Sequence, residues 1–176
     1  MSSAGAASDD AAARLVAELT RQRLRIAVAE SLTGGLVVAE LTGIPGASLV
    51  VSGGVVAYDT AIKRSLLGVD ADLLRREGAV HPEVARQMAT GVRTALAIGG
   101  RPADVGVATT GVAGPDEQDG RPVGTVHVGV AIGDRVEVID LALGGDRAAI
   151  RQQTVQAAVE AVLARLDDQP LEPGRR

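Results

Sequence analysis

The sequence predicts an α/β fold in which helices cover both faces of a largely parallel sheet. Short apolar runs alternate along the chain with segments of helical periodicity, a pattern typical of parallel sheets. Gly133-Asp134, between two late β patterns, indicates a hairpin and therefore an antiparallel strand. The length of 176 residues suits a single domain. With 30 Ala, 24 Val, one Tyr and no Phe or Trp, the core requires close packing of helices against the sheet.

Apolar periodicity and capping residues predict the helices. Leu15, Val16 and Leu19 share one face of the first helix. Asp59 is a suitable N-cap, and Pro82 suits the first position of a long helix. The helices are expected at 10–23, 36–41, 59–67, 70–76, 82–96 and 146–166.

Five short β patterns lie between these helices. Gly53-Gly54 within the second pattern indicates a bulge or the close approach of another backbone. The glycine-rich segment 109–124 is polar and is expected to lack regular structure. The strands are expected at 24–29, 49–58, 104–109, 125–132 and 135–141. Residues 1–9 are expected to be disordered and 169–176 to form a tail, leaving one domain at 10–168.

Composition excludes several classes of protein. The chain has no Cys, which excludes disulfide scaffolds and thiol nucleophiles, and its two His make a multi-histidine metal site a poor hypothesis. No apolar run is long enough to cross a membrane, and the N-terminus has no secretory pattern. A net charge of −4 without stacking aromatics argues against nucleic acid as a partner. We therefore expect a soluble cytoplasmic protein.

Ligands of parallel sheets gather at the carboxyl ends of the strands, where this sequence turns polar or glycine-rich. Ser31 follows the first strand and precedes Thr33-Gly34-Gly35 and a helix. Such a turn exposes a hydroxyl beside several backbone N–H groups, which suits a nucleophile with an oxyanion hole or an anion at a helix N-terminus. An ordinary N-cap serine followed by turn glycines is the structural alternative.

Tyr58 and Lys63 mark the end of the second strand. Tyr58 is the only aromatic residue and Lys63 the only lysine among 18 basic residues. A desolvated lysine can act as a base toward a serine, whereas an arginine cannot, and Tyr58 could relay the proton or orient the lysine. A surface lysine beside a half-buried tyrosine is the structural alternative.

Two further segments could bind an anion. Thr110, Gly111 and Gly114 belong to a loop whose backbone N–H groups could hold a phosphate or an amide, or the loop could be an ordinary turn. Arg147 and Arg151 lie four residues apart on one helix and could bind a phosphate, or they could form a solvated stripe.

We interpret His81 as a turn or capping residue and His127 as a partnered sheet residue. The acidic residues lack the spacing of a metal site.

Taken together, these segments resemble the CinA C-terminal domain family, whose stand-alone members are nicotinamide-nucleotide amidohydrolases (NMN deamidases, the PncC type). The resemblance covers about residues 10–166. Its matching motifs, in family order, are AESLTGG (29–35), VVAYDTAIK (55–63), GAV (78–80), TGVAGPD (110–116), RPVGTV (121–126) and GGDRAAIRQQ (144–153). It implies a three-layer α/β/α sandwich around a mixed, mostly parallel five-stranded sheet with one late antiparallel strand.

The resemblance also implies hydrolysis of the carboxamide of nicotinamide mononucleotide (NMN) to nicotinate mononucleotide and ammonia. The family's nucleophile falls on Ser31, and its tyrosine and lysine fall on Tyr58 and Lys63. The implied substrate-binding residues are Thr33, Gly34, Gly35, Thr110, Gly111, Gly114, Arg147 and Arg151. No metal and no organic cofactor is implied, and by analogy with the family we expect a homo-oligomer, a dimer or higher.

The sequence departs from the family pattern at three places. Leu32 stands where the family usually has Cys, His81 stands where it often has Ser, and 117–119 are Glu-Gln-Asp where it is commonly glycine-rich. The acidic loop adds negative charge near a site expected to bind a phosphate. Two other interpretations stay open: a non-catalytic, nucleotide-binding regulatory protein associated with competence or damage, and a hydrolase of another amide or phosphate.

Overall fold

The sheet has five strands in the order β2-β1-β3-β4-β5. The computed structural model describes residues 4–168, with side chains from 11 to 166. The strands are β1 (Ile26–Glu30), β2 (Val51–Val56), β3 (Val105–Gly111), β4 (Thr125–Ile132) and β5 (Arg135–Ala142). β1 pairs in parallel with β2 and β3, whereas β4 is antiparallel to both β3 and β5. The mixed, mostly parallel sheet with one late antiparallel strand is therefore confirmed.

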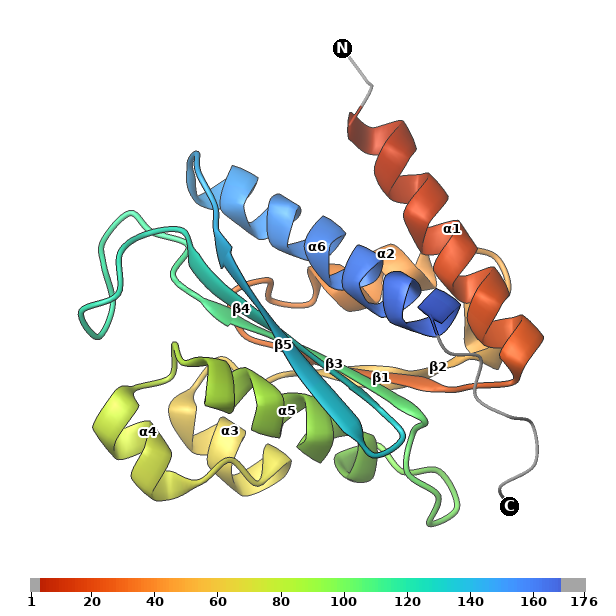
Figure 1. Ribbon diagram of the computed structural model, residues 1–176, viewed down its shortest axis with the longest axis horizontal. Coiled ribbons are helices and arrows are strands. Elements are labelled where there is room, and N and C mark those ends of the chain that lie inside the picture. The colour runs from red at the N-terminus through yellow and green to blue at the C-terminus, as the bar shows by residue number, and fades with distance from the viewer. Residues whose placement is uncertain (1–3, 169–176) are drawn as a thin grey trace.

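Helices cover both faces of this sheet, as expected for a three-layer sandwich (Figure 1). One layer contains α1 (Ala4–Gln22), α2 (Leu36–Thr42) and α6 (Arg147–Asp168). The other contains α3 (Thr60–Leu67), α4 (Ala71–Glu77) and α5 (Pro82–Ala95). A short 3-10 helix, η1 (Ala47–Leu49), was not predicted and leads into β2.

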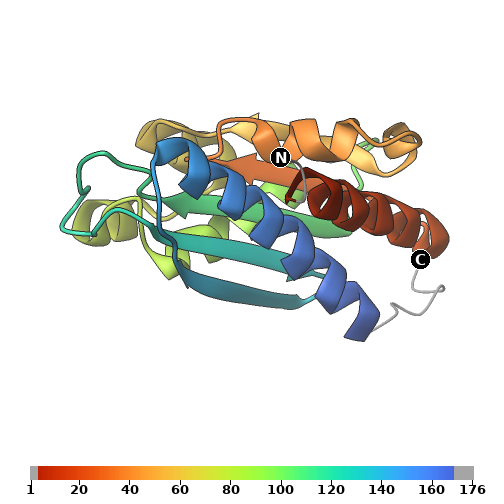
Figure 2. The same cartoon turned by 90° about the horizontal axis from the view of Figure 1, so that it is seen from above.

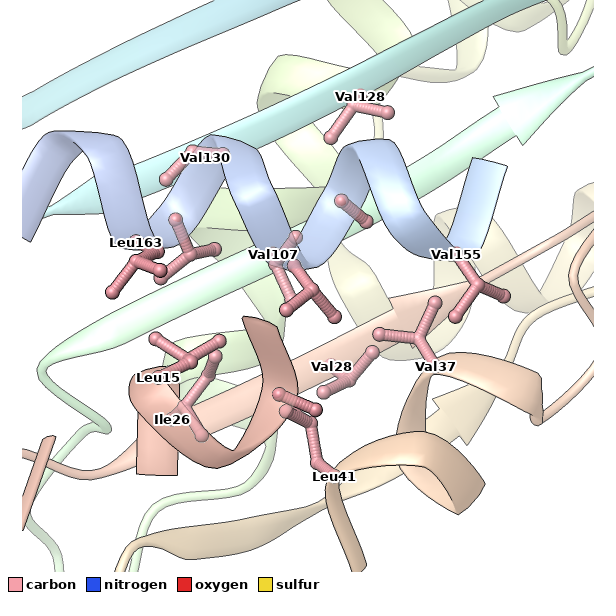
Figure 3. Packing of buried hydrophobic residues seen from close by; sticks show 14 of the residues in the cluster. Leu15, Ile26, Val28, Val37, Leu41, Val107, Val128, Val130, Val155 and Leu163 are labelled. Carbon is pink, nitrogen blue, oxygen red and sulfur yellow. The ribbon is translucent and has the colours of Figure 1, made fainter. Parts of the chain in front are cut away.

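The two faces of the sheet have different cores because side chains alternate along each strand. On the α1/α6 face, branched side chains such as Val28, Val107 and Val128 pack against the helices (Figure 3). On the α5 face the strands carry Ala and Gly, and α5 comes close: a Cβ at Gly106 would lie 2.0 Å from the Ala89 carbonyl oxygen. The close helix–sheet packing predicted from the composition is therefore present on the α5 face.

Several boundaries differ from the prediction. α1 begins at Ala4 and not at residue 10, so part of the segment expected to be disordered is helical. β3 extends into the loop expected to be irregular, and the same loop contains a tight turn at residues 118–121, closed by two backbone hydrogen bonds. Asp119 and Gly120 both have positive φ there, which an Asp-Gly pair favours. The expected tail, 169–176, lies outside the described residues.

The glycine pair in β2 lies next to a bulge, and its close neighbour is a side chain of α2 and not another backbone. The pairing of β1 with β2 is irregular near its start, where the register shifts between Ile26 and Ala27. A Cβ at Gly54 would lie 2.0 Å from Cγ2 of Val38, so the glycine permits α2 to approach the sheet. Among the described residues, no helix has the length and apolar character needed to cross a membrane.

This topology brings the site together. The carboxyl ends of β1, β2 and β3 lie at one edge of the sheet, because the three strands run in parallel. The start of α6 and the loop between β3 and β4 lie at the same edge (Figure 2). Residues from four distant parts of the chain can therefore meet there.

Candidate active site

The candidate nucleophile, Ser31, begins a sharp turn between β1 and α2, which we call the serine turn (residues 31–35). The Ser31 N–H donates to the Thr109 carbonyl oxygen at 3.0 Å, which extends the pairing of β1 with β3 by one residue. Gly34 and Gly35 have φ of 61° and 100°, a conformation that other residues rarely adopt. The two glycines thus let the chain reverse into α2 directly after the serine.

Glu30 holds the far side of this turn. Its carboxylate is fully buried and accepts hydrogen bonds from the N–H groups of Gly35, Val37 and Val38 at 3.0 to 3.1 Å. The anion at the N-terminus of α2 is therefore a side chain of the protein itself, and Gly35 N–H is not free for an oxyanion. The sequence analysis missed this role, although a carboxylate close before a helix start is a usable signal.

The serine turn is also held from two other elements. Thr33 Oγ1 lies 2.8 Å from Thr109 Oγ1 of β3, and both side chains are buried. Arg151 of α6 donates from Nε to the Leu32 carbonyl oxygen at 2.9 Å and from Nη2 to the Thr33 carbonyl oxygen at 3.0 Å. The turn is thus fixed by contacts with residues far away in the sequence.

Lys63 lies on α3, and its amine is in contact with Ser31. The side chain is only 1% exposed, and Nζ lies 3.1 Å from Ser31 Oγ. Nζ also donates to the carbonyl oxygens of Ala57 at 2.7 Å and Tyr58 at 3.1 Å. The proposed partners Ser31 and Lys63, 32 residues apart, are therefore hydrogen-bonded in a buried setting.

Burial lowers the pKa of Lys63 from 10.5 to about 8, against a smaller opposing effect of the Asp59 carboxylate. A neutral amine keeps two N–H groups and gains a lone pair. Those two N–H groups can serve the carbonyls of Ala57 and Tyr58, while the lone pair accepts the Ser31 hydroxyl. The geometry therefore fits a lysine that acts as a base toward the serine.

Tyr58 contributes its backbone to Lys63 but presents its side chain elsewhere. Its side chain is 60% exposed, and its hydroxyl accepts a hydrogen bond from Arg147 Nη2 at 3.1 Å. Arg147 Nη1 also donates to the Gly114 carbonyl oxygen at 2.8 Å. Tyr58 thus connects the two groups: its hydroxyl is bonded to Arg147 and its carbonyl oxygen to Lys63.

A pocket of about 270 Å³ joins these groups. Of the predicted site residues, Ser31, Tyr58, Lys63, Thr110, Gly111, Gly114 and Arg147 line it. Thr33, Gly34, Gly35 and Arg151 do not belong to its lining. Thr33 Oγ1 contacts Thr109 of β3, Gly35 N–H binds Glu30, and Arg151 of α6 donates to the carbonyls of the turn. Thr110 Oγ1 is bonded to the Ala79 carbonyl oxygen at 2.7 Å and so fixes the wall formed by the 78–80 segment.

The backbone N–H groups of Leu32, Ala113 and Gly114 are among those at the pocket that make no hydrogen bond within residues 4–168. In the serine turn, by contrast, Gly34 N–H donates to the Ser31 carbonyl oxygen at 3.1 Å. Leu32 and the 113–114 loop therefore join the candidate oxyanion donors predicted at 33–35 or 110–111, whereas the N–H groups of Gly34 and Gly35 already have partners.

Acidic side chains also line the pocket. Asp116 and Glu117 are exposed, and neither makes an ion pair within the part of the chain that the structure describes.

The described residues contain no group of three or more His, Asp or Glu that could hold a metal ion. The interpretation of both histidines is confirmed: His81 Nδ1 caps α5, and His127 Nδ1 lies 2.7 Å from Asp140 Oδ1 on β5.

The fold and the site define a class: an α/β/α protein that carries a buried serine–lysine pair at the ends of its parallel strands. Comparison with known proteins is more specific. The model of the CinA C-terminal domain family matches residues 8–166, and the chain belongs to this family.

Individual relatives agree with this membership. A CinA-like protein of Frankia casuarinae is 45% identical over 158 residues, covering 90% of this chain and 35% of that protein. A putative competence-damage inducible protein of a Geobacillus species is 46% identical over 154 residues, covering 87% of this chain and 36% of that protein. The chain thus spans about a third of the length of these relatives.

Solved structures show the same fold. The competence/damage inducible protein CihA of Agrobacterium tumefaciens has a TM-score of 0.83 at 36% identity, covering 89% of this chain and 94% of that chain. A CinA superfamily protein of Klebsiella pneumoniae has a TM-score of 0.86 at 29% identity, covering 92% of this chain and 99% of that chain.

Proposed function

We propose that this chain is an amidase that hydrolyses the carboxamide of NMN to nicotinate mononucleotide and ammonia. The observation that carries this proposal is the contact between Lys63 Nζ and Ser31 Oγ, 3.1 Å long, buried, and made by a lysine whose pKa is lowered to about 8. A serine activated by a neutral amine is a device for acyl transfer. The choice of NMN rests on the motifs that this chain shares with the family's stand-alone members.

Acylation begins when Ser31 Oγ attacks the carboxamide carbon and its proton passes to Lys63 Nζ. The developing oxyanion is stabilised by backbone N–H groups of Leu32, Ala113 or Gly114, each of which has no other partner in the described chain. The carbon–nitrogen bond then breaks, and Lys63 returns the proton to the leaving ammonia. The product of this step is an ester between Ser31 and the nicotinoyl group.

Deacylation repeats the sequence with water. Lys63 accepts a proton from the water as its oxygen attacks the ester carbon, and then protonates Ser31 Oγ as the ester bond breaks. The net reaction consumes one water and releases nicotinate mononucleotide and ammonia. It needs no cofactor to balance.

The pocket mouth suits the rest of the substrate. Arg147 lies beside Tyr58 and Gly114, at the rim of the pocket, where its guanidinium can bind the 5′-phosphate. Tyr58 orients both groups, because its hydroxyl is bonded to Arg147 and its carbonyl to Lys63. In the proposed complex the phosphate binds Arg147, and the carboxamide lies against Ser31.

The test is incubation of the purified chain with NMN while ammonia and nicotinate mononucleotide are measured. Ser31→Ala should abolish release while binding of NMN persists, and Lys63→Ala should lower release at pH 7 by at least 100-fold. Binding of NMN by the wild-type chain without ammonia release would refute the proposal and favour a nucleotide-binding regulatory protein. Undiminished release by Ser31→Ala would refute the mechanism alone.

A further inference from the structure

We propose that Arg151 is a positioning residue that holds the serine turn for catalysis and does not bind the substrate's phosphate. The two arginines of α6 occupy different environments. Arg147 contacts the pocket rim, whereas Arg151 is partly buried and donates to the Leu32 and Thr33 carbonyl oxygens. This inference rests on the proposed function in taking Ser31 as the nucleophile.

The contacts of Arg151 complete a set that fixes three consecutive peptide groups after the serine. The Ser31 carbonyl accepts from Gly34 N–H at 3.1 Å, the Leu32 carbonyl from Arg151 Nε, and the Thr33 carbonyl from Arg151 Nη2. A peptide group is planar, so fixing its carbonyl also fixes the direction of the N–H that follows. The backbone around the nucleophile therefore has little freedom to rotate.

The guanidinium is suited to this task because its planar fork offers two parallel donors to two neighbouring oxygens. A Cβ placed on Gly34 would lie 3.3 Å from Arg151 Nη2, so the guanidinium lies directly against the turn. Glu30 holds the opposite side through the N–H groups of Gly35, Val37 and Val38. The buried Glu30 carboxylate thus binds backbone N–H groups of this segment, while the Arg151 guanidinium binds its carbonyl oxygens.

By holding the serine turn, Arg151 keeps Ser31 in position for its contact with Lys63. Without Arg151, the Leu32 carbonyl loses its partner and the Thr33 carbonyl keeps only the 3.3 Å bond from Leu36 N–H, so the turn can rotate away from the 3.1 Å contact with Nζ. Displacement of a reacting atom by about 1 Å can lower a rate about 100-fold. We therefore expect loss of Arg151 to reduce the reactivity of Ser31 itself, whatever the substrate.

The experiment measures that reactivity without relying on NMN. A fluorophosphonate phosphonylates an activated serine, forming an oxygen–phosphorus bond and releasing fluoride, and intact mass reports the extent. The variants are Arg151→Met, Arg151→Lys and the control Arg165→Met, with Ser31→Ala as the blank. Arg165 is a matched control because it lies on the same helix and is bonded to Glu137 and Ala161 far from the site.

We expect labelling of Arg151→Met to be about 100-fold slower than that of the wild type, with Arg151→Lys between the two, because an ammonium lacks the fork. Arg165→Met should label within about twofold of the wild type. With NMN, Arg151→Met should lower kcat with little change in KM. Thermal unfolding of each variant is measured alongside, and Arg151→Lys keeps the test valid if Arg151→Met does not fold.

Wild-type labelling of Arg151→Met together with a raised KM for NMN would overturn the inference and assign the residue to phosphate binding. A wild-type chain that is not labelled at Ser31 would also overturn it. Slow labelling of the Arg151 variants in a chain that releases no ammonia from NMN would support the positioning role and refute the proposed function alone.

Discussion

The pH dependence of the reaction tests the role of Lys63 most directly. Only the neutral amine can accept the Ser31 proton, and burial lowers the pKa of Lys63 from 10.5 to about 8. At pH 7 about one tenth of the lysine is then neutral, against about one in 3000 for an exposed lysine, a gain of about 300-fold. We expect kcat/KM for NMN to rise about tenfold per pH unit below pH 7 and to level off above about pH 8.5.

The assay is the initial rate of ammonia release at low NMN concentration between pH 6 and 10. Asp59→Asn sharpens it, because the Asp59 carboxylate raises the pKa of Lys63, so its removal should move the midpoint below that of the wild type. Asn also caps helices well, which preserves the start of α3. Asp70→Asn, which changes the cap of α4, should leave the midpoint unchanged. A flat profile from pH 6 to 9, or a midpoint near 10.5, would refute Lys63 as the base.

Three other predictions concern stability and binding. The pKa of Lys63 falls from 10.5 to about 8 on folding, so between these pH values the unfolded chain binds the proton more tightly than the folded chain. The free energy of unfolding of the wild type, measured by denaturant titration, should therefore rise by up to about 3 kcal/mol relative to Lys63→Met from pH 8 to 10.5. A constant difference would contradict this. Asp116→Asn with Glu117→Gln should tighten binding of NMN in calorimetry, and more so at low salt, because both carboxylates line the pocket that receives the phosphate; unchanged affinity would exclude the repulsion. Gly91→Ala should lower the free energy of unfolding by about 1–3 kcal/mol, although Ala favours a helix, because the new Cβ would lie 1.8 Å from the Leu67 carbonyl oxygen; a more stable variant would show that α3 and α5 separate easily.

The fold could be predicted largely from the sequence because its signals are local. Alternating β-branched strands and capped helices determined the order of the elements, and Gly133-Asp134 indicated the hairpin in which β4 and β5 pair antiparallel. The scarcity of large side chains indicated close packing, which the Ala and Gly residues under α5 provide. Boundaries failed where tertiary contacts decide them, as at η1 and at the end of β3.

The candidate site could be predicted only in part. Ser31 and Lys63 were paired because both follow strand ends and because Lys63 is the only lysine, and the structure places them in contact. Arg151 was grouped with Arg147 because four residues separate them on a helix. Their spacing cannot show that Arg151 contacts the carbonyl oxygen of Leu32, which lies 119 residues earlier in the chain, and that Arg147 does not. Contacts to backbone atoms leave no mark on the residue type of the acceptor.

The same limit applies to the feature that makes Lys63 suitable for its role. Nζ meets two carbonyl oxygens and one hydroxyl. A protonated amine can donate to all three, and a neutral amine can donate to the two carbonyls while it accepts from Ser31. Both protonation states therefore keep every polar atom paired, so the lysine can take up a proton and return it without rearranging its surroundings. Had a third carbonyl stood in the place of Ser31, the neutral form would lose that contact and the pKa would rise. The number of carbonyls around the amine, set by where β2 ends and α3 begins, thus matches the two states that an acid–base catalyst must visit.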